Sequence, residues 1–286
     1  MIARLIFVVL LAVAGSARAF DFGKALETLN SADAQKALDI GKKMVKSAQD
    51  ISEPQEIEIG NGVAARLLGA SPLVRNDALQ KYVNRVGLWL ALQTDRPALP
   101  WRFGVTDDPA VNAFAAPGGT ILITRGLYER LHDESELAGV LAHEISHVLR
   151  KHQLKAIKSS LGREWQLELA QAVADKKDST GAAASLKAFT AGTELYARGL
   201  DKGDEFEADR MGVVIAARAG YNPFGLVTAL QTLDAINPQD GAVALMFKTH
   251  PAPAKRLEML GNAMGTRLDD YAGSQEPGRF IPLASK

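Results

Sequence analysis

The chain has 286 residues, of which 47% are hydrophobic and 23% charged, and its acidic and basic residues balance to a formal net charge of zero. This composition is that of a globular protein with one large domain or two small ones, and it offers no basic surface of the kind that binds nucleic acid. Because the chain contains no cysteine, disulfides, thiol catalysis and thiolate metal ligands are excluded, and any metal must be held by histidine and carboxylate.

The N-terminal segment has the features of a secretory signal peptide. Arg4 provides a positive charge, residues 5–14 form an uninterrupted apolar run, and Ala17 and Ala19 place small residues before a cut after Ala19. The apolar run is short for a membrane span, although an uncleaved anchor is the alternative. No cysteine stands at the cleavage site, so we do not expect a lipoprotein.

The segments that follow have the apolar period of helices. This period extends over residues 20–50, resumes after Pro54 from Glu56 to Gly69, and is strongest over residues 72–92. We interpret these helices as a packing scaffold.

Beyond residue 100 the pattern changes to short strands. Residues 101–105 alternate large apolar with small or polar side chains, and residues 111–116 and 120–124 flank Pro117-Gly118-Gly119, a strong turn signal. We therefore predict a small antiparallel sheet with a hairpin at the glycine pair.

The first strand of this hairpin is a candidate for substrate binding. Its side chains are mostly small, so its backbone is approachable, and an extended peptide could pair with it as an added strand. A purely structural hairpin is the alternative. The candidate substrate-binding residues are Asn112, Ala113, Phe114 and Ala115.

A predicted helix after Asp133 carries a metal-binding motif. Asp133 and Glu136 form a capping box, and the helix that follows is apolar over much of its surface. His143 and His147 are four residues apart, so both imidazoles lie on one face and can reach one ion. Glu144 cannot share that row, but it can reach a water at the ion. A surface helix with two incidental histidines is the alternative.

Two further histidines and a poorly patterned segment lie near this motif. His132 and His152 are explained by their places at helix ends. Residues 155–195 have helical propensity but are interrupted around 178–184 by small and polar residues. We interpret 155–195 as an insertion or a lid over the site.

An acidic stretch downstream offers a third metal ligand. A catalytic zinc commonly has three protein ligands, and spacing alone does not choose between Asp204, Glu205 and Glu207. One carboxylate on the metal and another that accepts the outer N–H of a ligand histidine would fit Glu205 with Asp209, which share a helix face. A solvated acidic first turn is the alternative.

Four stretches together resemble the gluzincin metallopeptidase family that includes HtpX, the mitochondrial Oma peptidase, the CAAX prenyl peptidases, BepA and LoiP. The stretches are Asn112 to Gly119, His143-Glu144-x-x-His147, Glu205 to Gly212, and Thr249-His250-Pro251 with Arg256 following. The histidine motif alone occurs in many zinc peptidases, whereas its combination with Glu-x-x-Ala-Asp and His-Pro is much more specific. One departure is Lys202, which stands where many members have arginine.

The resemblance implies an α+β fold, mostly helical and of the zincin type, with a small antiparallel sheet next to the zinc-binding helix. It assigns the metallopeptidase domain to residues 20–265, between the signal peptide at 1–19 and a short polar tail at 266–286. In that tail, residues 280–283 are predicted to dock as a strand.

The resemblance also assigns roles to side chains. Asp209 is expected to support a ligand histidine, and Glu144 to act as the catalytic base. His250 matches a histidine that can approach the metal, where it either blocks the fourth position or polarises the substrate carbonyl. The expected ligands of Zn²⁺ are His143, His147 and Glu205.

We therefore expect a periplasmic zinc endopeptidase that acts on misfolded or unassembled envelope proteins. Its expected partners are polypeptides and not nucleic acid, and peripheral association with a membrane is left open. The alternative is a periplasmic chaperone or adaptor whose zinc site is latent because His250 plugs it. Glu144 favours the peptidase, since a pure binding protein has no need of a glutamate there.

Overall fold

A computed structural model of the chain describes residues 51–159, 199–271 and 279–283. The chain separates into two compact units, residues 1–51 and 52–286, and the elements below belong to the second. The predicted signal peptide, the predicted helix over 20–50 and most of the segment 155–195 lie outside the described residues. Among the described helices, none combines the length and apolarity needed to cross a membrane.

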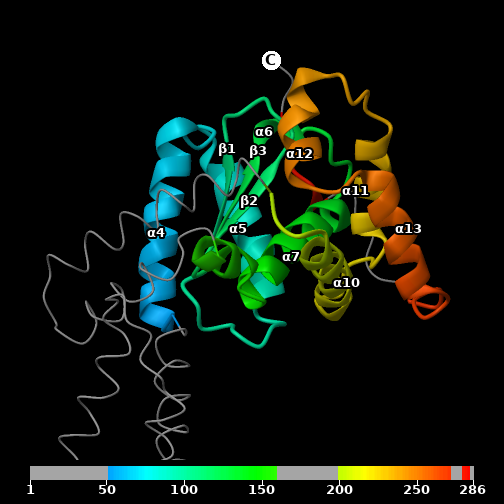
Figure 1. Ribbon diagram of the computed structural model, residues 1–286. Helices are drawn as coiled ribbons and strands as arrows, with labels where there is room; N and C mark the ends of the chain where they lie inside the picture. The colour runs from blue at the N-terminus through cyan, green and yellow to red at the C-terminus, as the bar shows by residue number, and fades with distance from the viewer. Residues whose placement is uncertain (1–50, 160–198, 272–278, 284–286) are drawn as a thin grey trace, which may run out of the picture. The chain divides into compact units, whose positions relative to one another are not determined.

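Helices make up most of the described structure, which confirms the expected α+β fold (Figure 1). Residues 152–159 are also helical. Helix α4 begins three residues before the predicted start, with Pro54 in its first turn, where proline is tolerated. The helices are α4 (Glu53–Ala70), α5 (Asp77–Ala91), α6 (Arg125–Tyr128), α7 (Glu134–Leu149), α10 (Lys202–Arg218), α11 (Gly225–Asp234), α12 (Ala244–Thr249) and α13 (Pro253–Met264), with the 3-10 helix η1 (Gly241–Val243) before α12.

Three short strands form one mixed sheet in the order β1–β3–β2. They are β1 (Arg102–Thr106), β2 (Ala113–Ala116) and β3 (Thr120–Thr124). β2 and β3 form the predicted antiparallel hairpin, and Gly118 and Gly119 have φ angles of 76° and 108° in its turn. β1 pairs with β3 in parallel, so the predicted antiparallel arrangement holds only for the hairpin.

The parallel pairing follows from which strand is central. Ile121, Leu122 and Ile123 of β3 are all buried, so this strand is covered on both faces, as suits the middle of a sheet. The chain reverses between β1 and β2 and again at the glycine turn, so the first and third strands point the same way. Because the third strand is the neighbour of the first, their pairing is parallel.

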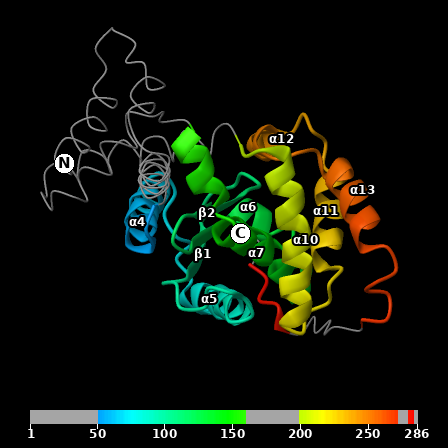
Figure 2. The same cartoon turned by 60° about the horizontal axis from the view of Figure 1, so that its bottom comes forward.

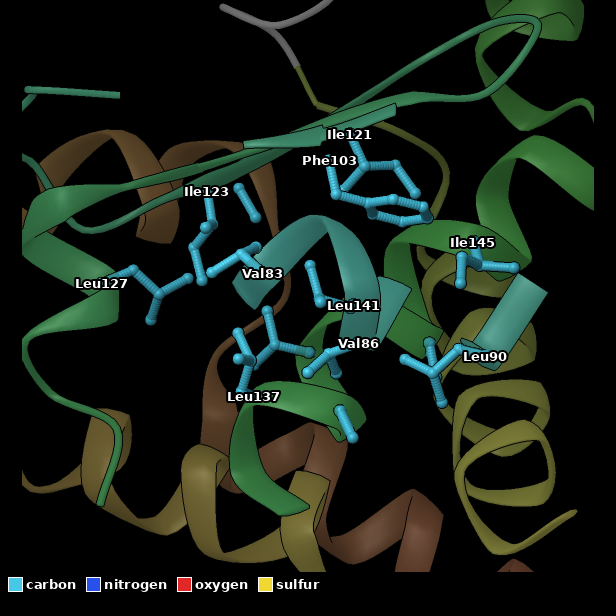
Figure 3. Packing of buried hydrophobic residues seen from close by; sticks show 14 of the residues in the cluster. Val83, Val86, Leu90, Phe103, Ile121, Ile123, Leu127, Leu137, Leu141 and Ile145 are labelled. Carbon is cyan, nitrogen blue, oxygen red and sulfur yellow. The ribbon is translucent and has the colours of Figure 1, made fainter. Parts of the chain in front are cut away.

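Helix α7 lies at the centre of the described unit. It contacts α5 and the sheet as well as α10 and α11, as Figure 2 shows from a second direction. Every residue from Glu134 to Val148 is buried. Apolar side chains of α5, the sheet, α6 and α7 meet in one core, where Figure 3 labels Val83, Val86, Leu90, Phe103, Ile121, Ile123, Leu127, Leu137, Leu141 and Ile145.

The N-terminus of α7 differs from the predicted capping box in one detail. The Asp133 carboxylate accepts a hydrogen bond from the Glu136 backbone N–H at 2.8 Å, as predicted. The Glu136 carboxylate, however, accepts from the backbone N–H of His132 at 2.7 Å, one residue further back. There it also lies 3.1 Å from Nδ1 of the His132 ring.

The C-terminal tail docks without forming a strand. Phe280 stacks on Tyr128 with ring centroids 5.2 Å apart, and the Tyr128 hydroxyl donates a hydrogen bond to the Ile281 carbonyl at 2.6 Å. Residues 280–283 carry no strand assignment, because the contact uses a ring and one carbonyl and not a backbone ladder.

Close packing of α10 against α7 depends on Gly212. A Cβ at this position would lie 2.9 Å from the backbone nitrogen of His143 and 3.1 Å from its Cα. The two helices therefore approach at backbone distance beside the metal-binding motif.

We predict that Gly212→Ala destabilises the protein by about 1–3 kcal/mol, because the added methyl group forces the two backbones apart. Urea unfolding followed by circular dichroism measures the change. Gly261→Ala in α13 is the matched control, since nothing lies within 4 Å of a Cβ there. That control should gain about 0.5–1 kcal/mol from helix propensity, and equal effects of the two substitutions would contradict the packing argument.

Candidate metal centre

Two histidines of α7 and one glutamate of α10 converge in the interior. The Nε2 atoms of His143 and His147 are 3.1 Å apart. A Glu205 oxygen lies 3.5 Å from Nε2 of His147, and the other lies 3.7 Å from Nε2 of His143. The ligand atoms of these three residues all lie within 4.8 Å of one another. The structure thus brings together the three residues that the sequence analysis predicted as ligands.

The Glu205 carboxylate tests whether a cation fits here. Its side chain is 1% exposed, and neither oxygen has a hydrogen-bond partner in the described part of the chain. Burial raises the pKa of Glu205 to about 8, because an isolated carboxylate is costly in the interior. A divalent cation between the three side chains would compensate that buried charge.

The histidines are in the protonation state that a metal requires. Burial lowers the pKa of both His143 and His147, so each is a neutral imidazole with a lone pair available on one ring nitrogen. Two imidazole nitrogens and one carboxylate oxygen form a donor set suited to zinc. The residues present therefore fit the expected ion.

An ion pair lies behind His143. Nδ1 of this ring is 2.9 Å from Asp209 of α10, and Arg256 of α13 donates to both oxygens of the same carboxylate, at 3.0 and 2.5 Å. Burial alone would raise the pKa of Asp209, but the Arg256 guanidinium outweighs it and holds that pKa well below its usual range. An ionised Asp209 accepts the Nδ1 proton of His143 and leaves Nε2 to face Glu205.

Glu144 lines two small cavities that border the cluster. Both cavities are also lined by His250 and by Asn112 and Ala113, and Phe114 and Ala115 line the first. Burial raises the pKa of Glu144 to about 8, although Arg256 acts in the opposite direction. The predicted substrate-binding residues thus border the same space as the predicted base.

His250, the C-cap of α12, also lies close to the cluster. Its Nε2 is 3.8 Å from Glu205, its ring centroid is 6.3 Å from that of His143, and Nδ1 is 3.0 Å from the Thr249 hydroxyl. Burial lowers the pKa of His250 to about 3, so the ring is neutral. A neutral imidazole at this position can accept or donate one hydrogen bond, or offer a lone pair to an ion.

His152 lies at the start of the helix that follows α7, and this place alone does not explain its contacts. α7 ends at Leu149, Lys151 has a φ of 56°, and the chain turns so that His152 starts the next helix with no exposed surface. Its Nδ1 lies 2.9 Å from Nδ1 of His147. The left-handed backbone conformation of Lys151 does not change the spacing of apolar residues, so the sequence could not predict this contact.

The other two candidate ligands face His152. Asp204 and Glu207 each place an oxygen 3.3 Å from Nε2 of His152, away from the ring nitrogens of the predicted zinc ligands. Of the three carboxylates that spacing left open, only Glu205 joins the cluster with His143 and His147.

Known proteins are similar in sequence to the part of the chain that carries this site. Residues 77–263 match Peptidase family M48. The chain is 30% identical over 210 residues to the beta-barrel assembly-enhancing protease of Escherichia coli (strain K12). This aligned stretch covers 72% of this chain and 43% of that protein. It is 28% identical over 179 residues to the mitochondrial metalloendopeptidase OMA1 of Schizosaccharomyces pombe, with 63% and 51% covered. It is 29% identical over 154 residues to the metalloprotease LoiP of Escherichia coli (strain K12), with 54% and 59% covered. The chain therefore matches about half the length of these relatives.

We predict that the metal-free protein loses stability as the pH rises from about 6.5 to 8. Glu144 and Glu205, with pKa values raised to about 8, still hold protons in the folded state at a pH where the unfolded chain has lost them. The free energy of unfolding should fall by roughly 1–3 kcal/mol across this window. Below pH 6.5 the buried histidines, whose pKa values are lowered, act in the opposite direction.

Urea unfolding in the presence of a chelator measures this dependence. Glu205→Gln removes one of the two groups and should flatten the slope. Added zinc should reduce the slope, since the ion takes the place of the proton on Glu205. A metal-free protein whose stability stays constant from pH 6.5 to 8 would contradict the predicted burial of these carboxyl groups.

Proposed function

Because the chain belongs to peptidase family M48, we propose that it is a zinc-dependent endopeptidase that cleaves misfolded or unassembled envelope proteins in the periplasm. Its relatives named as metalloendopeptidase and metalloprotease support a metallopeptidase that acts on polypeptides. The observation that carries the zinc site is the buried Glu205 carboxylate, which faces two neutral imidazoles and has no hydrogen-bond partner among the described residues.

The zinc-holding residues would be His143, His147 and Glu205. When bound, zinc supplies a Lewis acid that polarises the scissile carbonyl and acidifies a water. Three protein ligands of this kind are typical of catalytic zinc sites, which keep a fourth position for water or substrate. The ionised Asp209 binds the proton on Nδ1 of His143, so the lone pair on Nε2 would be available to the zinc.

Glu144 is the proposed general base. It follows His143 on α7, so its side chain leaves the helix about 100° from the ligand row and points to a different part of the site. It borders both cavities next to the ligand cluster. A carboxylate whose pKa has been raised toward neutrality can take a proton from water and return it to the leaving amine.

The substrate is proposed to lie extended along β2. This strand is at the edge of the described sheet, and Asn112, Ala113, Phe114 and Ala115 border the cavity that contains Glu144 and Glu205. A peptide in strand conformation would pass its carbonyl groups over Glu144. A segment without stable structure of its own adopts that conformation readily, which supports the proposed substrate class.

The proposed compartment comes from the N-terminal sequence and the relatives. The signal-peptide features of residues 1–19 favour export, and cleavage after Ala19 leaves no cysteine to carry a lipid. One relative is named for enhancing β-barrel assembly. We accordingly propose unassembled β-barrel proteins as substrates, and we leave peripheral membrane association open.

A second function is supported by one specific contact. His250 has its Nε2 3.8 Å from Glu205 and is neutral, so it could fill the fourth position of the ion and close the site. The protein would then be a chaperone or adaptor with a latent zinc site. In the peptidase, the same ring would instead donate to the developing oxyanion of the substrate.

Glu144→Gln should abolish turnover and leave the metal in place, because it removes the base but none of the ligands. We expect a loss of at least about 100-fold in the rate of cleavage of an unfolded model protein. Elemental analysis should find zinc in this variant and none in His147→Ala. Full proteolysis by Glu144→Gln would contradict the mechanism.

His250→Ala separates the two functions. If His250 plugs the site, this variant should cleave an unfolded outer-membrane protein faster than the parent; if it stabilises the oxyanion, cleavage should slow by about 10- to 100-fold. The parent and His250→Ala should be compared in a cleavage assay and in a light-scattering assay of aggregation. Suppressed aggregation by both proteins with cleavage by neither would establish the chaperone and exclude the peptidase.

A further inference from the structure

The Nδ1 atoms of the two histidines in the zinc motif have different partners. Nδ1 of His143 meets the Asp209 carboxylate directly, at 2.9 Å. Nδ1 of His147 meets another imidazole, that of His152, also at 2.9 Å. Both rings of this second pair are buried, and their planes cross at 72° with centroids 5.1 Å apart.

The hydrogen-bond chemistry fixes every proton in this chain of contacts. Nε2 of His147 faces Glu205 and His143, so its lone pair is the one available to a metal. An imidazole that offers Nε2 to a metal carries its one proton on Nδ1. Among the described residues, the partner of this Nδ1–H is Nδ1 of His152, which must then accept and carry its own proton on Nε2.

The proton on Nε2 of His152 faces two carboxylates, and Glu207 is its hydrogen-bond partner. Asp204 and Glu207 each place a carboxylate oxygen 3.3 Å from this nitrogen. These residues are three apart on α10, so they lie on one face of that helix. The carboxylates thus select the tautomer of His152, and His152 in turn selects the tautomer of His147.

We propose that His152 is a positioning residue, which holds His147 in the tautomer and ring orientation that bind zinc and is itself oriented by Asp204 and Glu207. This inference rests on the zinc site of the proposed function. α10 would then support all three ligands, since it carries Glu205 itself, Asp209 behind His143, and the two carboxylates behind His152.

The same three side chains fit a second metal site less well. His152, Asp204 and Glu207 are close enough to share an ion. However, Arg150 already donates to Glu207 at 2.6 Å, which supplies a positive charge to that carboxylate. The Nε2 atom of His152, which would have to bind the ion, carries the proton that the contact with His147 requires.

The test compares His152→Ala with His152→Asn. Alanine leaves Nδ1–H of His147 without an acceptor, and zinc affinity should fall by about 10- to 100-fold. Asparagine places its Oδ1 atom where Nδ1 of histidine stands, so it can accept from His147 and should restore affinity to within about threefold of the parent. Competition with a chromophoric chelator measures the affinity, and thermal unfolding of the zinc-free proteins checks that each variant is folded.

Two results of this comparison would overturn the proposal. One is a zinc affinity of His152→Ala within twofold of the parent. The other is an affinity of His152→Asn as low as that of His152→Ala, which would mean that the ring acts through packing alone.

A second set of variants leaves His152 in place. Asp204→Asn combined with Glu207→Gln removes both carboxylates from partly exposed positions and should lower zinc affinity by about 10-fold. Asp95→Asn combined with Glu258→Gln removes the same charge from exposed positions and should leave affinity unchanged. Equal affinities of the two double variants would also overturn the proposal.

Failure of the inference can be told from failure of the proposed function. If the parent protein binds no zinc, both the proposed zinc site and this inference are wrong. If the parent binds zinc but cleaves nothing, the proposed peptidase function is wrong. The zinc affinities of the His152 variants would still decide whether this residue positions His147.

Discussion

The site depends on the contact between α7 and α10 at backbone distance. Gly212 lets α10 approach His143 so closely that a single added carbon would collide with the α7 backbone. At that separation Glu205 can place a carboxylate against two imidazoles in a space with no described hydrogen-bond donor for it. The arrangement is unfavourable by itself, because a buried carboxylate without a partner is costly. A cation bound between the three side chains would offset this cost.

Local periodicity explains what could be predicted from the sequence. Spacing of four residues on a helix places His143 with His147, and Glu205 with Asp209, whatever the rest of the fold is. It could not select Glu205 over Asp204 and Glu207, because the rotation of α10 about its axis is set by packing against α7. The partner of β1 and the contact of His152 were missed for a related reason. Strand order and the left-handed turn at Lys151 are decided by tertiary structure and leave no period in the sequence.

Charge in this interior is arranged as one connected group. Arg256 comes from α13, far along the chain from α7, yet its side chain is 7% exposed and ion-paired with Asp209. It lowers the cost of the buried acids, because it also counteracts the rise in the pKa values of Glu144 and Glu205. The site therefore needs α7, α10 and α13 in place together, and no fragment of the chain that lacks α13 would retain its electrostatic balance.

The complete burial of α7 has a consequence for how the ion is acquired. Small zinc domains fold only when the metal arrives, because they have little apolar core. Here the helix with both histidines is buried from Glu134 to Val148, and its apolar side chains belong to one core with the sheet and neighbouring helices, so its position does not depend on an ion alone. Folding and metal loading are thus separable events.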